Sequence, residues 1–125
     1  MTNTVNTVGL YVRDQDEALE FYVGTLGFEV HTDVRNGSYR WLTVRSPDQD
    51  GFQLGLFVPG PLTHDAATAQ ALQQLVAKGA IPPLVLAVDD CHARYAQWQL
   101  SLADRALPRP GWLPAGPVRA GATDP

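Results

Sequence analysis

The hydrophobic pattern of the chain predicts a short strand followed by a helix, and this strand–helix pattern occurs twice. The first copy has its apolar positions and capping aspartate at Leu10, Val12, Asp14, Leu19, Tyr22 and Leu26. The second copy has them at the same offsets, at Leu86, Val88, Asp90, Tyr95, Trp98 and Leu102. A pattern that recurs at one fixed spacing is typical of an internal duplication. We therefore expect two related halves.

The first half is predicted to fold as strand, helix and three strands. Alternating apolar residues predict a strand over residues 5–12, and Asp14 is expected to cap the following helix with Glu17 as a capping-box partner. Gly27 supplies the left-handed position that ends this helix. The side that it buries is expected to consist of Leu19, Tyr22, Val23 and Leu26.

Three strands are predicted after this helix, over residues 28–34, 39–45 and 52–58. The pair Asn36 and Gly37 favours a two-residue hairpin turn between the first two. The first half is therefore a β-α-β-β-β unit.

The second half begins in the same way and then changes composition. Asp65 is expected to cap a helix over residues 66–78, a strand is predicted over residues 84–88, and Asp90 opens another helix. Residues 103–125 hold five prolines and three glycines. Since proline cannot donate to a strand ladder, an irregular tail is expected there.

These patterns divide the chain into four segments. Residues 1–61 form the first βαβββ module, and residues 62–82 a connecting helix and linker. Residues 83–102 start a second module with a strand and a helix, and residues 103–125 are the irregular tail.

The composition indicates a soluble globular protein of one domain or two half-domains. Of the 125 residues 45% are hydrophobic and 18% charged, with a net charge of −4. Without a basic cluster, we expect no nucleic-acid partner. Neither a membrane-length apolar run nor a signal-peptide pattern is present, and the single cysteine, Cys91, fits a reducing cytoplasm.

The first half carries a more specific pattern, in which Phe21-Tyr22 is followed at close spacing by Leu26-Gly27-Phe28. With the duplicated β-α-β-β-β unit, it resembles the vicinal oxygen chelate superfamily, which includes glyoxalase I, bleomycin-resistance proteins, fosfomycin-resistance enzymes and extradiol dioxygenases. The resemblance implies an α+β fold in which paired βαβββ modules form an incomplete barrel. Here the second module is expected to be incomplete.

Metal-dependent members of that superfamily place four ligands on the inner face of the barrel. The first-strand position corresponds to Thr7, and the histidine position of the second module to Pro83. The fourth-strand position falls on the face that carries Gln53, Gly55 and Phe57, where only Gln53 offers an oxygen, and the last position has no counterpart. Threonine is a very weak ligand and proline cannot ligate. We therefore expect no metal site and no cofactor, with a divalent metal only as the alternative.

Other residues with reactive side chains form no recognisable catalytic group. His31, His64 and His92 form no metal-binding pair, and Cys91 is expected to pack in a helix stripe. His64 is the strongest of the histidines because it precedes the helix near the expected cavity mouth. Catalytic residues are left unassigned.

Strand alternation predicts which residues line the concave face. If Val8, Leu10, Leu54 and Leu56 face the helices, the opposite face carries several aromatic and polar side chains. An aromatic surface of this kind holds planar small molecules, although it could also fill a collapsed interior or a dimer contact. The candidate ligand-binding residues are Tyr11, Trp41, Thr43, Gln53 and Phe57.

Three functions remain open. The favoured one is metal-independent binding of a small molecule, as bleomycin-resistance proteins do. The second is a metal-dependent lyase, isomerase or dioxygenase with a degenerate or intersubunit site, for which Gln53 and His64 are the first suspects. The third is an interaction protein or a truncated, non-functional product. An unfinished second sheet leaves a strand edge exposed, so a homodimer is expected.

Overall fold

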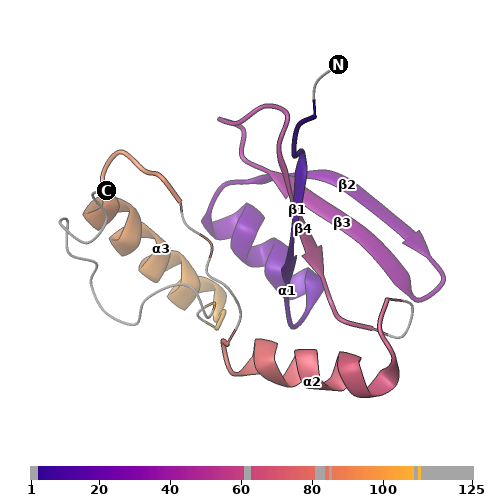
Figure 1. Ribbon diagram of the computed structural model, residues 1–125. Helices are drawn as coiled ribbons and strands as arrows, with labels where there is room; N and C mark the ends of the chain where they lie inside the picture. The colour runs from indigo at the N-terminus through magenta and orange to yellow at the C-terminus, as the bar shows by residue number, and fades with distance from the viewer. Residues whose placement is uncertain (1–2, 61–62, 81–83, 85, 109, 111–125) are drawn as a thin grey trace.

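The computed structural model describes residues 3–60, 63–80, 84, 86–108 and 110, and it shows one sheet with helices around it (Figure 1). In chain order the elements are β1 (Thr7–Tyr11), α1 (Gln15–Leu19), the π-helical segment η1 (Glu20–Thr25), β2 (Glu29–Asn36), β3 (Tyr39–Arg45), β4 (Gln53–Phe57), α2 (Ala66–Ala77) and α3 (Cys91–Arg105).

The four strands form an open sheet in the order β1-β4-β3-β2. β1 runs parallel to β4, whereas the other neighbours are antiparallel. Gly37 turns the β2–β3 hairpin with a φ of 64°. The predicted α+β fold is confirmed, with a complete first βαβββ module, and the described residues form a single open sheet that does not close into a barrel.

The core lies between the sheet and the α1–η1 helix. Leu42, Val44 and Leu56 are fully buried on this side of the sheet. The buried cluster also includes Val12, Ala18, Phe21, Tyr22, Leu54 and Leu102. Because β3 and β4 alternate, their other side chains point to the opposite face.

Each longer helical segment begins with an aspartate whose carboxylate accepts a hydrogen bond from the N–H three residues on. The pairs are Asp14 with Glu17, Asp65 with Thr68 and Asp90 with Ala93. The N–H of Thr68 holds the pKa of the Asp65 carboxyl below its usual value. The predicted caps are therefore present, while the Glu17 carboxylate accepts from Arg13 at 2.7 and 2.8 Å.

The first helix differs from the sequence prediction at its C-terminal end. The N–H of Leu26 bonds to the carbonyl of Phe21 at 3.0 Å, which is the wider spacing of a π-helix. The wider turn brings Phe21 and Thr25 into the core, and Val23 is 37% exposed. The prediction that Val23 belongs to the buried stripe was wrong for this reason.

The predicted strand over residues 84–88 does not form. Leu84 and residues 86–88 lie outside any strand, and Val85 lies outside the described residues. A strand needs a partner, and the sequence that should provide the rest of the second sheet is rich in proline. The strand that was expected to open the second module is therefore absent from the described residues.

α3 packs against η1 and extends beyond its expected end. Thr25 and Ser101 share a hydrogen bond of 2.8 Å, and the Arg105 guanidinium lies 2.5 Å from the position of a Cβ on Gly24. Residues 103–105, predicted to be irregular, are the last residues of this helix. Most of the predicted tail lies outside the described residues.

Among the described residues, no helix is long and apolar enough to cross a membrane.

Candidate functional site

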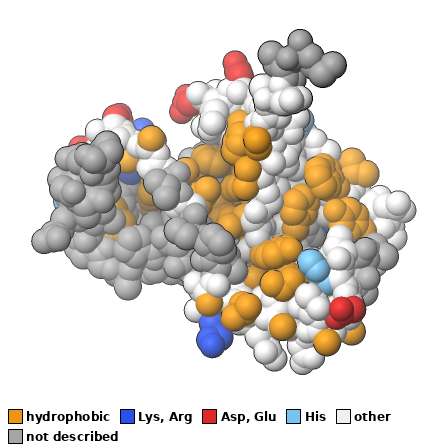
Figure 2. Space-filling model, viewed as in Figure 1, with side chains coloured by type: hydrophobic (Ala, Val, Ile, Leu, Met, Phe, Trp, Pro, Cys, Tyr) orange, Lys and Arg blue, Asp and Glu red, His pale blue; other side chains and the backbone are white. Residues whose placement is uncertain are grey.

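The candidate residues lie on one face of the sheet, opposite the helical core. The strand register places Tyr11 beside Phe57 and Thr43 beside Gly55, with side chains on the same face. Hydrophobic side chains are gathered over the strands and above α2 in Figure 2. The register and the alternation of the strands place Tyr11, Trp41, Thr43, Gln53 and Phe57 on one face of the sheet, which we call the aromatic face.

Trp41 and Phe57 form the centre of the aromatic face. Their ring centroids lie 5.0 Å apart and the ring planes meet at 41°. Trp41 is 39% exposed, a large fraction for an indole ring within a sheet. An aromatic pair with an exposed ring offers a flat apolar surface to a planar molecule.

Two glycines make room for the Phe57 ring. A Cβ built on Gly9 would stand 3.3 Å from Cδ2 and Cε2 of this ring. A Cβ on Gly55 would stand 2.6 Å from its Cζ atom, closer than real carbon atoms approach. The ring therefore packs against backbone that has no side chains, and a side chain at Gly55 would displace it.

Thr43 is paired with Gly55 in the β3–β4 register and is fully buried. Its Oγ1 atom has no hydrogen-bond partner among the described residues. Buried hydroxyl groups are normally paired, so this one stands out.

Tyr11 contacts the loop before α2. Its hydroxyl lies 3.1 Å from Nε2 of His64, and the two rings meet edge to face with centroids 6.0 Å apart. β1 and this loop are thus tied together at one border of the aromatic face.

The residues at the positions of the superfamily's metal ligands do not suit a metal. The Thr7 hydroxyl donates to the side-chain oxygen of Asn6 at 2.9 Å, and Gln53 offers only an amide oxygen. Pro83 lies outside the described residues, and proline has no side-chain donor atom. Within the described ranges, no three residues among His, Cys, Asp and Glu stand close enough to share a metal ion.

A hollow of about 280 Å³ opens beside Phe57 at the end of β4. Tyr39, Pro59 and Gly60 contribute to its walls, together with Arg40. The Arg40 guanidinium is almost buried and donates to Asp33 and Asp16 at 2.8 to 2.9 Å. These carboxylates raise the pKa of Arg40 further above its usual value, and the hydrogen bond from Arg40 lowers the pKa of Asp33.

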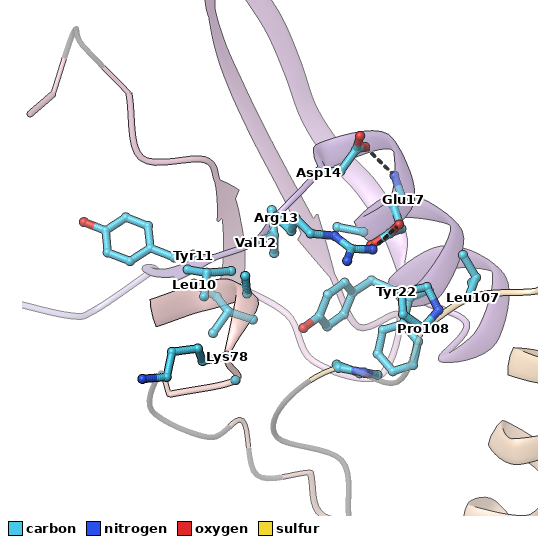
Figure 3. Close-up of a pocket in the computed structure, with 16 residues that line it drawn as sticks. Leu10, Tyr11, Val12, Arg13, Asp14, Glu17, Tyr22, Lys78, Leu107 and Pro108 are labelled. Carbon is cyan, nitrogen blue, oxygen red and sulfur yellow. Dashed lines mark hydrogen bonds and ion pairs between the residues drawn. The ribbon is translucent and has the colours of Figure 1, made fainter. Parts of the chain in front are cut away.

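A second cavity, of about 260 Å³, lies on the helical side of β1. It is bounded by Leu10, Val12, Tyr22 and residues 107–108 (Figure 3). The Tyr11 ring points away from Tyr22 in this view. Tyr11 also contributes to the wall of this cavity, so the cavity borders the aromatic face at β1.

The sequence analysis did not predict the Tyr11–His64 contact. It also missed the backbone of Gly9 and Gly55 under the Phe57 ring, which we call the glycine floor. A signal for the floor was available, because Gly9 and Gly55 share strand parity with Tyr11 and Phe57. No pattern links His64 to Tyr11, since the contact depends on the path of the loop before α2.

Comparison with known sequences identifies similar proteins. The sequence model of the Glyoxalase/Bleomycin resistance protein/Dioxygenase superfamily matches residues 4–99. Uncharacterized protein YurT of Bacillus subtilis (strain 168) is 40% identical over 87 residues, which cover 69% of this chain and 65% of YurT. The chain thus spans less than two thirds of the length of this curated relative.

Solved structures show the same arrangement. UcmS2 is 37% identical, with 81% of this chain and 76% of UcmS2 covered and a TM-score of 0.73. TnmS3, described as an antibiotic binding protein from Streptomyces sp. CB03234, is 28% identical with a TM-score of 0.56, covering 79% of this chain and 70% of TnmS3. A superfamily member from Sphaerobacter thermophilus DSM 20745 is 26% identical with a TM-score of 0.57, covering 79% and 71%.

Proposed function

The chain belongs to the Glyoxalase/Bleomycin resistance protein/Dioxygenase superfamily, and we propose that it binds a planar small molecule on the aromatic face without a metal ion. The family assignment confirms the resemblance found in the sequence. The observation that carries the proposal is the exposed Trp41–Phe57 pair.

The shape and chemistry of the aromatic face support a small-molecule ligand. Small-molecule sites are mostly apolar and aromatic, with a few polar groups that fix the orientation of the ligand. Trp41 and Phe57 provide the apolar surface, and Tyr11 and Gln53 provide polar atoms on the same face. The Thr43 hydroxyl is a further polar group on this face and is buried. The antibiotic-binding description of TnmS3 is consistent with this role.

The metal-independent part of the proposal rests on the chemistry of the available donors. A threonine hydroxyl and a glutamine amide are weak ligands beside the histidine and carboxylate groups that hold catalytic divalent metals. Binding by stacking and hydrogen bonds needs none of these ligands.

Titration calorimetry with naphthalene-2-sulfonate tests the proposal on the full chain. We expect Trp41→Ala to weaken binding by about tenfold, because an aromatic contact of this kind is worth about 1 kcal/mol beyond the buried area. Leu100→Ala is the matched control, since Leu100 is 69% exposed on α3, outside the aromatic face. Equal losses in the two variants would contradict the proposed site.

Metal analysis of protein purified without chelator tests the second part. We expect less than stoichiometric Zn, Ni or Mn and an unchanged affinity for naphthalene-2-sulfonate after treatment with EDTA. Stoichiometric metal together with lost binding after chelation would favour the metal-dependent alternative, in which Gln53 would be the first residue to test.

We also propose that two copies associate through β1. The carbonyl of Asn6 and the N–H of Val12 bond to β4, so the intervening Thr7, Gly9 and Tyr11 direct their backbone groups outward. Among the described residues no strand pairs with this edge, and residues 3–12 carry no charge to protect it. A second copy would cover this edge, and a monomeric mass in sedimentation equilibrium at micromolar concentration would refute the association.

A further inference from the structure

The Thr43 hydroxyl is the most unusual polar group on the aromatic face. Thr43 has no exposed surface, and its Oγ1 atom has no partner among the described residues. Folding gains nothing from an unpaired hydroxyl in a buried position, since it loses its bond to water. A polar group of a ligand that reaches this position would restore the missing hydrogen bond.

The Phe57 ring lies on the same face of the sheet as the Thr43 side chain, over the residue that is paired with Thr43. Thr43 is paired with Gly55 in the β3–β4 register, and the Phe57 ring lies directly over Gly55. The ring therefore occupies the space beside Thr43 that a ligand would need.

Few side chains hold the Phe57 ring where it lies over the two glycines, and a hollow beside it could accommodate the ring. Gly9 and Gly55 present no side chains that would interlock with it. The hollow of about 280 Å³ beside β4 is lined by Phe57 itself, with Tyr39 and Val58. Rotation between staggered χ1 positions moves an aromatic ring by several ångströms without moving the backbone.

We infer that Phe57 is a movable cover and that Thr43 is the polar anchor beneath it. The ligand is then a planar aromatic molecule that carries a hydroxyl or carbonyl group. When the Phe57 ring swings into the hollow, the ligand ring takes its place beside Trp41, and the hydroxyl or carbonyl group bonds to Thr43 Oγ1. The inference rests on the proposed function and adds the chemical class of the ligand and the residue that selects it.

Two matched probes test the anchor by calorimetry on the full chain. Naphthalene-2-sulfonate and 6-hydroxynaphthalene-2-sulfonate differ only in one hydroxyl group. We expect the hydroxylated probe to bind about tenfold more tightly, which is the value of one well-made hydrogen bond in a closed site. Thr43→Val, which keeps the shape and loses the hydroxyl, should abolish this preference, and Thr43→Ser should retain it.

The calorimetry results distinguish a failure of the Thr43 anchor from a failure of the proposed binding function. If both probes bind the unaltered chain equally well, or if Thr43→Val keeps the preference, the anchor is refuted and the binding function stands. If neither probe binds, the proposed function fails and the anchor fails with it.

Acrylamide quenching of Trp41 fluorescence tests the cover in the unliganded protein. The other two tryptophans are removed by Trp98→Phe and Trp112→Phe, and this chain is the reference. Gly55→Ala places a methyl group where the Phe57 ring lies, so we expect the ring to leave and the quenching constant of Trp41 to rise. Gly60→Ala is the control, because a Cβ there meets only a backbone oxygen at 3.8 Å.

Phe57→Leu keeps this test decisive if Gly55→Ala does not fold. The smaller side chain uncovers Trp41 without adding an atom to the floor, and the quenching constant should again rise. An unchanged constant in the variants that fold would refute the cover.

Discussion

The hydroxyl of Tyr11 lies 3.1 Å from Nε2 of His64, so the last residue of β1 is tied to the loop before α2. The two residues are far apart in sequence and belong to different predicted segments. Their contact fixes one border of the aromatic face, and the rings also meet edge to face.

A double-mutant cycle measures this contact. We expect Tyr11→Phe and His64→Ala each to lower the free energy of unfolding by about 1 kcal/mol, because a partly exposed hydrogen bond contributes about this much. Their combined effect should be smaller than the sum by about 0.5 kcal/mol, since both remove one bond. Urea denaturation checks this, with Tyr39→Phe as a control for the loss of a tyrosine hydroxyl. Strict additivity would mean that the bond does not form in solution.

The ion pair between Arg40 and Asp33 is expected to make the free energy of unfolding depend on pH. The hydrogen bond from Arg40 lowers the pKa of Asp33 in the folded chain below its ordinary value of 3.8. The unfolded chain therefore binds a proton more readily, and the stabilisation is complete above pH 3.8 and lost as the pH falls through the folded pKa. Asp33→Asn should remove this part of the acid sensitivity.

The size of the effect at pH 7 is limited by solvent. The Asp33 side chain is 36% exposed, so we expect Asp33→Asn to cost about 1 kcal/mol of unfolding free energy. Thermal unfolding between pH 2 and pH 7 measures both effects, and Asp50→Asn serves as the exposed control. An identical pH profile for Asp33→Asn and the unaltered chain would show that the ion pair is not formed.

The backbone at Gly27 gives a third prediction. Gly27 ends the first helical segment with a φ of 80°, a conformation that other residues adopt only with strain. Gly27→Ala should therefore lower the free energy of unfolding by about 1 kcal/mol, although a Cβ there would meet no other atom. Gly60→Ala is the matched control and should change stability by less than about 0.5 kcal/mol. Equal effects in chemical denaturation would contradict the role of φ.

Local signals account for the parts of the fold that the sequence predicted. β3 was placed at its observed ends because residues 39–45 follow a turn with Asn36 and Gly37 and alternate in polarity. The three helix caps were also predicted, since an aspartate that caps a helix bonds to an N–H only three residues away.

The parts that sequence reasoning missed depend on contacts between distant segments. The π-helical turn at residues 20–25 has no composition signal, because its wider hydrogen bonds are selected by packing against the sheet and α3. The segment 84–88 has the composition of a strand, but a strand forms only where a partner is available. The candidate site shows the same difference. Alternation predicts that five side chains share one face, but it cannot predict that the Phe57 ring lies over Gly55.

Gln15 connects the first helix to the central strands. Its side-chain N–H group donates to the carbonyl of Leu56 at 2.8 Å and to that of Arg40 at 3.2 Å. One amide therefore holds the start of α1 against β3 and β4. Its side chain also contributes to the hollow beside Phe57.

Replacement of this amide by a carboxyl group makes a specific prediction. In Gln15→Glu the ionised side chain has no donor and faces two carbonyl oxygens, so the free energy of unfolding at pH 7 should fall by about 2 kcal/mol. The protonated carboxyl can donate one hydrogen bond, which raises the pKa of the introduced group in the folded state. Its stabilising bond is then present below the ordinary glutamate pKa and lost as the pH rises through the raised value.

The variant should therefore regain part of its stability between about pH 6 and pH 4, where glutamate takes up a proton. Gln15→Leu removes the donor without introducing a titrating group and should be destabilised with no such recovery. Urea unfolding of the two variants over this pH range measures the difference. Parallel pH profiles for Gln15→Glu and Gln15→Leu would show that the side chain does not hold the two carbonyl groups, and the start of α1 would then depend on the Asp14 cap and core packing alone.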